Sequence, residues 1–126
     1  MEFNIEKHDN HTFIQVLTEK LDTNVAPGLK SELVLISGKG EKNIIIDLNK
    51  VKYCDSNGLS ALLVANRLCK NANGTFVLTG LNDAVDRLIT ISQLDTVLNI
   101  AYSREEAEEI IKVEEEDRKS GQNKGK

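Results

Sequence analysis

The chain has 126 residues, a length that suits one compact domain with a single hydrophobic core. Hydrophobic residues make up 40% of it and aromatic residues only 4%, which is a globular composition. The formal net charge of -4 argues against a nucleic-acid partner, because a protein that binds nucleic acid normally shows a basic face.

The start of the chain and its two cysteines indicate the location of the protein and the groups that it binds. Residues 1–4 lack the basic segment followed by an apolar one that marks a signal peptide, and no apolar run approaches the length of a membrane span. Cys54 and Cys69 each lie in an apolar stretch, which favours buried small side chains over a disulfide or a metal site. The sequence therefore predicts a cytoplasmic protein with no membrane partner, no metal and no other cofactor.

The first half of the chain predicts a hairpin, a helix and a buried strand. Short apolar runs at 3–7 and 13–17 flank the polar residues 9–11, a pattern typical of a β-hairpin. Apolar positions spaced three and four apart over 26–36 predict a helix, and glycines follow it. The nearly continuous apolar run 43–48 predicts a central strand that is covered on both faces.

The second half continues the alternation of helices and strands. A long helix is predicted to begin at Ser56, and its apolar stripe runs over 59–69. The elements predicted after it are a strand over 75–79, a helix capped by Asn82, a strand over 97–100 and a helix capped by Ser103. The order β-β-α-β-α-β-α-β-α predicts an α/β fold with a mixed sheet, helices mainly on one face and the hairpin at one side. We expect the helix after Ser56 to be the longest, with Leu62 and Leu63 facing the sheet.

The last part of the chain is strongly acidic. Eight acids and one base, Lys112, lie between Glu105 and Asp117, a pattern that we interpret as a solvated helix face. Apolar content ends after about Glu114. We therefore expect one domain over residues 1–113 and an acidic and polar tail over 114–126 that is disordered or forms a frayed helix.

The segment from Asp55 to Leu59 carries the most specific chemistry. Ser56 lies where the N-cap of the long helix belongs, and its hydroxyl would accept an N–H of the first turn. Gly58 removes a side chain there, so another molecule's backbone or a phosphate would approach closely. A helix N-terminus tolerates a phosphate, and a phosphoserine would add roughly two negative charges beside Asp55. The alternative interpretation is that Ser56 serves only as a cap.

Three stretches of the sequence carry a family resemblance. Residues 51–60 resemble the signature of anti-sigma factor antagonists in the STAS domain family, where an apolar stretch leads into Asp-Ser-(Ser/Thr)-Gly-Leu-Gly. Residues 21–29 resemble a second landmark, Leu/Ile-Asp followed by an Ala-Pro-x-Leu helix start, and residues 79–94 resemble the family's third helix. The similarity runs from residue 3 to residue 112 and implies a STAS-like mixed β-sheet.

The resemblance implies a regulatory protein rather than an enzyme. The unphosphorylated form is expected to bind an anti-sigma factor with a histidine-kinase-like ATP site and so to free a sigma factor. That partner is expected to phosphorylate Ser56 and switch binding off, and a PP2C-type phosphatase is expected to restore the serine. The residues expected to bind the partner are Asp22, Thr23, Asn24, Asp55, Ser56, Asn57, Gly58 and Leu59.

The sequence departs from the family pattern at three positions. Asn57 stands where the family has Ser or Thr, Ser60 replaces the second glycine of Gly-Leu-Gly, and Glu19 stands where a glycine usually precedes the Leu/Ile-Asp landmark. These departures keep a second hypothesis open. In it, the chain is a phosphorylation-independent STAS scaffold subunit of a transporter or signalling assembly.

Catalysis at Ser56 is disfavoured by the residues around it. A serine nucleophile needs a nearby base and an orienting acid, and no Gly-x-Ser-x-Gly elbow is present. The only histidines, His8 and His11, lie near the N-terminus, and we interpret both as solvated turn residues.

Overall fold

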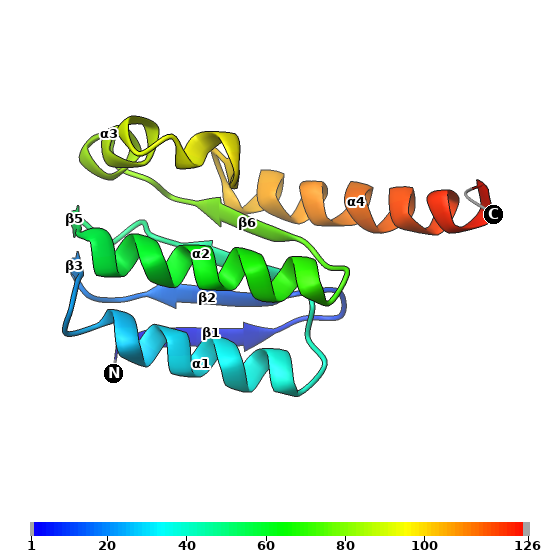
Figure 1. Ribbon diagram of the computed structural model, residues 1–126, viewed down its shortest axis with the longest axis horizontal. Coiled ribbons are helices and arrows are strands. Elements are labelled where there is room, and N and C mark those ends of the chain that lie inside the picture. The colour runs from blue at the N-terminus through cyan, green and yellow to red at the C-terminus, as the bar shows by residue number, and fades with distance from the viewer. Residues whose placement is uncertain (1, 125–126) are drawn as a thin grey trace.

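The computed structural model describes residues 2–124, which form a mixed α/β domain (Figure 1). The strands are β1 (Phe3–Lys7), β2 (Thr12–Val16), β3 (Lys20–Leu21), β4 (Ile44–Asp47), β5 (Tyr53–Cys54), β6 (Phe76–Thr79) and β7 (Asn99–Ala101). The helices are α1 (Ala26–Gly38), α2 (Ser56–Asn71), α3 (Asp83–Ile91), the 3-10 helix η1 (Leu94–Thr96) and α4 (Arg104–Lys124).

The main sheet has five strands in the order β1-β2-β4-β6-β7. The hairpin pair β1 and β2 is antiparallel, with Phe3 opposite Val16, whereas β2, β4, β6 and β7 run parallel to one another. This order confirms that the hairpin lies at one side of the sheet and that β4 is central. A separate parallel pair, β3 and β5, completes the structure.

The alternation of side chains along each strand divides the core between the two faces of the sheet. Ile44 and Ile46 of β4 pack in one cluster with residues of α1, α2 and α3. Ile45 lies in a second cluster, together with Ala107 and Ile111 of α4. Both faces of β4 are therefore covered, which explains its continuous apolar sequence, and the helices lie mainly on one face as expected.

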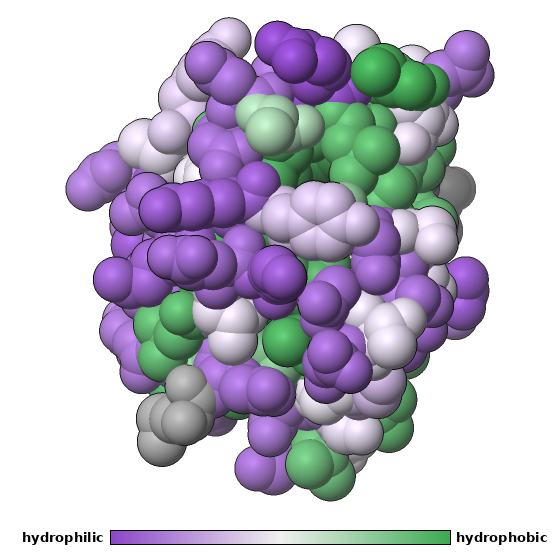
Figure 2. All heavy atoms as spheres, turned by 90° about the vertical axis from the view of Figure 1, so that its left-hand side faces the viewer, coloured by the Kyte–Doolittle hydropathy of each residue, from purple (hydrophilic) through white to green (hydrophobic). Residues whose placement is uncertain are grey.

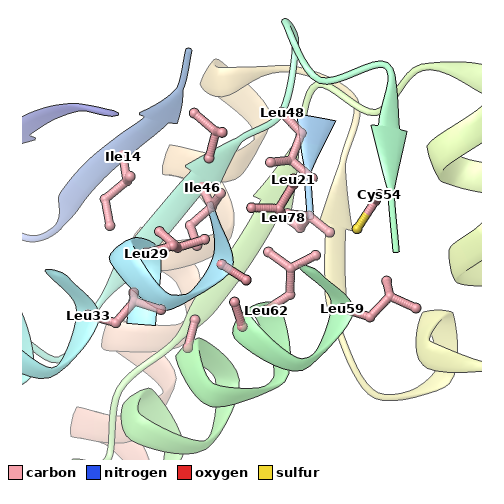
Figure 3. Close-up of a cluster of buried hydrophobic side chains, with 14 of the residues drawn as sticks. Ile14, Leu21, Leu29, Leu33, Ile46, Leu48, Cys54, Leu59, Leu62 and Leu78 are labelled. Carbon is pink, nitrogen blue, oxygen red and sulfur yellow. The ribbon is translucent and has the colours of Figure 1, made fainter. Parts of the chain in front are cut away.

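Helix α2 packs along the sheet beside α1 (Figures 1 and 3). Leu62 is 0% exposed, as predicted, and Leu63 is partly buried against the same cluster. The helix is not the longest one, however, because α2 has 16 residues and α4 has 21. Only the start of the last helix shows an apolar stripe, so the sequence pattern does not reveal its full length.

Residues 114–124, expected as a disordered tail or a frayed helix, continue α4. Polar contacts hold this extension in place. Arg118 donates to the Thr75 hydroxyl at 2.9 Å and to Glu115 at 2.7 Å, and Asn43 donates to Glu115 at 2.7 Å. The expected tail residues 125–126 lie outside the described residues. No helix within residues 2–124 is long and apolar enough to cross a membrane.

The turn of the hairpin also contacts α4. The expectation that His11 is a solvated turn residue is wrong, because this contact buries it. This side chain is only 5% exposed, and its ring stacks on that of His8 at a centroid distance of 4.8 Å. Its Nδ1 is hydrogen-bonded to the Asn10 side chain at 2.7 Å, and its Nε2 lies 3.8 Å from Glu108. Burial follows because α4 covers the turn, a contact that the local sequence does not reveal.

Candidate functional site

The turn between β5 and α2 places Ser56 at the first position of the helix. Asp55 is the N-cap residue: its backbone is extended and its Oδ1 accepts the N–H of Gly58 at 3.0 Å. The expectation that Ser56 caps the helix is therefore wrong. Asp and Ser are both good caps, and the residue with the extended backbone takes the role, which leaves the Ser56 side chain outside the cap.

A second loop, residues 22–24 between β3 and α1, lies beside this turn. Leu21 of β3 is paired in parallel with Cys54 of β5, so the chain leaves both strands at the same edge. Thr23 then meets the start of α2 directly. The Asp55 Oδ2 accepts the N–H of Thr23 at 3.3 Å, and the Asn57 side chain donates to the Thr23 hydroxyl.

Asp22 closes this second loop on itself. Its carboxylate accepts the N–H of Asn24 at 3.0 Å, and its carbonyl accepts the N–H groups of Val25 and Ala26. The cap position of α1 belongs to Val25, which makes no side-chain capping bond. The Asp22 side chain is therefore not the cap of this helix.

The expected partner-binding residues separate into surface and core. Thr23, Asn24, Ser56 and Asn57 are exposed, and we call these four residues the two-loop surface. Asp22 and Asp55 are half-buried beneath them. Gly58 and Leu59 are buried, and Leu59 belongs to the core cluster, part of which is drawn in Figure 3.

Position 58 requires glycine for a packing reason that the sequence alone does not reveal. A Cβ atom at this position would lie 2.2 Å from the Leu21 carbonyl oxygen and 2.6 Å from the Cys54 Sγ. The glycine thus lets α2 pack directly against β3 and β5, which fixes the two loops side by side. The space above it is filled by the protein itself and is not open to a partner.

The end of the molecule that carries these loops is mainly polar, as Figure 2 shows, with apolar side chains gathered toward α3. Exposed apolar residues of α3 and the segment after it are Ile91, 71% exposed, and Val97, 46% exposed. Tyr53, next to the site in β5, is 54% exposed. The sequence does not distinguish these residues, because a two-residue strand and a helix end carry too short a pattern.

Two of the departures from the family pattern, Glu19 and Ser60, lie close to this site. The Glu19 carbonyl accepts the N–H groups of Lys52 and Tyr53, and its side chain is exposed and paired with Lys52 at 3.6 Å. Pairing of this segment with β5 therefore uses the backbone of Glu19 and tolerates its side chain. Ser60 is half-buried on α2.

The site offers little of the chemistry that catalysis needs. Burial, with a smaller contribution from Asp55, raises the pKa of the Cys54 thiol to about 12, so this sulfur stays protonated. The two histidines lie at the hairpin turn, at the end of the sheet opposite the start of α2 (Figure 1). Within residues 2–124, no three His, Cys, Asp or Glu side chains are grouped to hold a metal ion.

The fold and the site together define a small mixed α/β domain whose candidate site is a pair of exposed loops. Residues 2–107 match the family model described as STAS domain. The chain belongs to the STAS domain family, which confirms the resemblance seen in the sequence.

Two relatives are similar to the chain over most of its length. The anti-sigma-B factor antagonist of Bacillus subtilis (strain 168) is 29% identical over 106 residues, which cover 83% of this chain and 96% of that protein. The anti-sigma-B factor antagonist of Listeria monocytogenes is 33% identical over 95 residues, which cover 75% and 82%.

Solved structures share the fold. An anti-sigma factor antagonist from Mycobacterium paratuberculosis matches with a TM-score of 0.78 at 22% identity, covering 87% of this chain and 92% of that one. The Bacillus cell fate determinant SpoIIAA in its phosphorylated form matches with a TM-score of 0.68 at 19% identity, covering 86% and 98%. A sulfate transporter family protein from Wolinella succinogenes matches at 0.63 and 22%, covering 82% and 86%.

Proposed function

We propose that the chain is an anti-sigma factor antagonist that is switched by phosphorylation of Ser56. The unphosphorylated form binds an anti-sigma factor with a histidine-kinase-like ATP site in the cytoplasm and so frees a sigma factor. The observation that carries the proposal is the position of Ser56. It is exposed, it is the first residue of α2, and its side chain is relieved of the capping role by Asp55.

The proposed switch is a phosphoryl transfer from ATP in the partner. The Ser56 Oγ gives its proton to a base of the partner and forms a bond to the γ-phosphorus. The bond from that phosphorus to the departing oxygen of ADP breaks, and ADP leaves. A PP2C-type phosphatase hydrolyses the ester and restores the serine. The partner supplies the nucleotide and the chain supplies only the acceptor, so the chain needs no cofactor of its own.

Charge gives the switch its direction. Docking covers the start of α2, where Asp55 already carries one negative charge beneath the two-loop surface. A phosphoryl group adds roughly two more negative charges. Docking would then require desolvation of these charges, or it would bring them against acidic groups of the partner that repel them. The phosphorylated form therefore releases the partner. The names of the two relatives as anti-sigma-B factor antagonists support the same assignment.

The test measures partner affinity by calorimetry with the histidine-kinase-like anti-sigma factors encoded in the same genome. We expect binding by the wild type and by Ser56→Ala, and a loss of on the order of tenfold or more for Ser56→Asp, because a fixed charge then sits in the contact. Thermal unfolding of each variant verifies that the fold is kept. Phosphopeptide mapping of protein from its own cells should place phosphate on Ser56.

Equal affinities for all three proteins, with no phosphate on Ser56 in cells, would overturn the switch and favour the second hypothesis. In it, the chain is a phosphorylation-independent scaffold subunit of a transporter or signalling assembly. The fold shared with the sulfate transporter family protein is the observation behind this second candidate.

A further inference from the structure

The carboxylate of Asp55 joins the two halves of the two-loop surface. Its Oδ1 accepts the N–H of Gly58 in α2 at 3.0 Å, and its Oδ2 accepts the N–H of Thr23 at 3.3 Å. One half-buried side chain thus caps a helix and also fixes a loop that lies 32 residues away in the sequence.

Asn57 provides the second tie between the loops, through its bond to the Thr23 hydroxyl. Asp55 and Asn57 stand immediately before and after Ser56. The neighbouring Asn24 is bonded within its own loop, to Asp22. The position of Thr23 relative to α2 is therefore set by the two residues that flank the proposed phosphoacceptor.

We propose that Asp55 is a positioning residue that couples the state of Ser56 to the second loop: when Ser56 carries a phosphoryl group, Asp55 releases the Thr23 amide, and Thr23 and Asn24 move relative to α2. Phosphorylation then alters both halves of the two-loop surface at once. The biological use of this coupling rests on the proposed function, but the coupling itself is a property of the isolated chain.

The physical reason is competition between two anions at one helix end. A phosphoryl group places roughly two negative charges on the residue next to the Asp55 carboxylate, which repels it. The phosphate is also attracted by the free N–H groups and the partial positive charge at the start of α2. Of the two bonds that Asp55 accepts, the bond to Thr23 is longer and leads to an exposed residue, so it breaks first.

The experiment uses the full chain with phosphoserine incorporated at position 56 during translation, so that no kinase is required. Nuclear magnetic resonance reads the shift and the hydrogen exchange of the Thr23 amide, with the amide of Ile89 in α3 as an internal reference. We expect phosphoserine to speed Thr23 exchange by on the order of tenfold and to leave Ile89 unchanged, because local opening is confined to the loop.

The variant Asp55→Asn separates coupling from a merely structural role. Asparagine caps α2 as well as aspartate does, but it has no charge and presents an N–H₂ group to the Thr23 amide. Its Thr23 amide should already exchange as fast as in the phosphorylated wild type. Phosphoserine should then change that rate by less than about twofold, because no carboxylate remains to be repelled.

The coupling is overturned if phosphoserine leaves Thr23 exchange unchanged in the wild type, or speeds it equally in Asp55→Asn. Partner affinity measured on the same proteins keeps the two proposals apart. Loss of affinity with an unchanged Thr23 amide would sink the coupling and leave the proposed function intact. An altered Thr23 amide with unchanged affinity would support the coupling and contradict the switch.

Discussion

At the start of α2, capping and the proposed phosphoacceptor role fall on neighbouring side chains. Asp55 has φ of -108° and ψ of -173° and bonds the first turn, while Ser56 already belongs to the helix. This division leaves the serine hydroxyl available without exposing the helix end. It also means that the two residues should differ in what they contribute to stability.

Replacing each of these residues by alanine tests that division. Asp55→Ala should lower the free energy of unfolding by about 0.5–2 kcal/mol, because the Gly58 N–H loses its cap. Ser56→Ala should change it by less than about 0.5 kcal/mol, since an exposed residue outside the cap is lost. Urea unfolding of the two variants gives the comparison, and a larger loss for Ser56→Ala would return the cap to the serine.

His11 predicts a loss of stability in mild acid. Burial lowers the pKa of its imidazole from 6.5, with nearby His8 and Arg104 acting in the same direction and Glu108 and Glu6 opposing them. His11 lines an open surface pocket, and the other charged residues around that pocket are Lys7, Asp9, Glu105, Glu109 and Lys112. The unfolded chain takes up the proton near pH 6.5 and the folded chain only at lower pH. Stability should therefore fall as the pH drops below about 6.5, by at most about 1.4 kcal/mol per unit for this group.

Unfolding in urea at pH values from 7.5 to 5 measures this loss, with His11→Asn as the matched variant. Asparagine retains an N–H group near the Asn10 side chain but does not titrate. Subtracting its pH dependence from that of the wild type isolates His11 from His8. A wild type that becomes more stable than the variant as the pH falls would show that the sign is wrong.

At the scale of elements, the extension of α4 depends on polar contacts. Arg118 reaches Thr75 just before β6, and Glu115 accepts from Asn43 just before β4. The pKa of Glu115 is held below its usual value, chiefly by the Asn43 hydrogen bond and also by Arg118 and Lys42. These contacts join the helix to the ends of two central strands.

Removing the arginine tests this attachment. Arg118→Ala should lower the free energy of unfolding by about 1–3 kcal/mol, because it breaks charge-assisted bonds to Thr75 and Glu115 and leaves Glu115 less well paired. The neighbouring Lys119→Ala, exposed on the same helix, should cost less than about 0.5 kcal/mol. Equal effects in urea unfolding would mean that the extension adds no stability through these contacts.

Elements with an apolar period were predictable, and those held by polar or backbone contacts were not. The run at 43–48 and the stripe from Leu59 to Cys69 reveal β4 and α2, because burial of apolar area selects those residues. The strands β3 and β5 have two residues each, too few for any period. The continuation of α4 rests on Asn43, Thr75 and Glu115, whose meeting no local pattern encodes.

The candidate site shows the same division. The position of Ser56 at the start of a helix followed from its motif, and the family resemblance added the loop at residues 22–24. The identity of the cap depended on one backbone conformation, and helix boundaries from sequence are uncertain by a residue or two. The reason for Gly58 depended on Leu21, which only the β3–β5 pairing brings close.

At the scale of the whole molecule, α2 runs from the end that carries the two-loop surface to the opposite end of the domain. The helix has 16 residues, which corresponds to a length of about 24 Å, and it runs along the sheet (Figure 1). Its start meets the loop at residues 22–24, and its last residue, Asn71, lies at the other end. A partner that docks on the two-loop surface therefore leaves the Asn71 end uncovered.

A matched pair of substitutions tests where the partner docks. Asn24 and Asn71 are both exposed asparagines, at opposite ends of the domain, and arginine at either adds the same bulk and charge. Asn24→Arg should weaken binding of the anti-sigma factor by about tenfold or more, because a long charged side chain must be accommodated within the contact. Asn71→Arg should change affinity by less than about twofold, because that end stays in solvent. Calorimetry gives both affinities, and thermal unfolding verifies that each variant keeps its fold. A greater loss at Asn71 would move the docking surface to the opposite end of the domain and remove the two-loop surface from the interface.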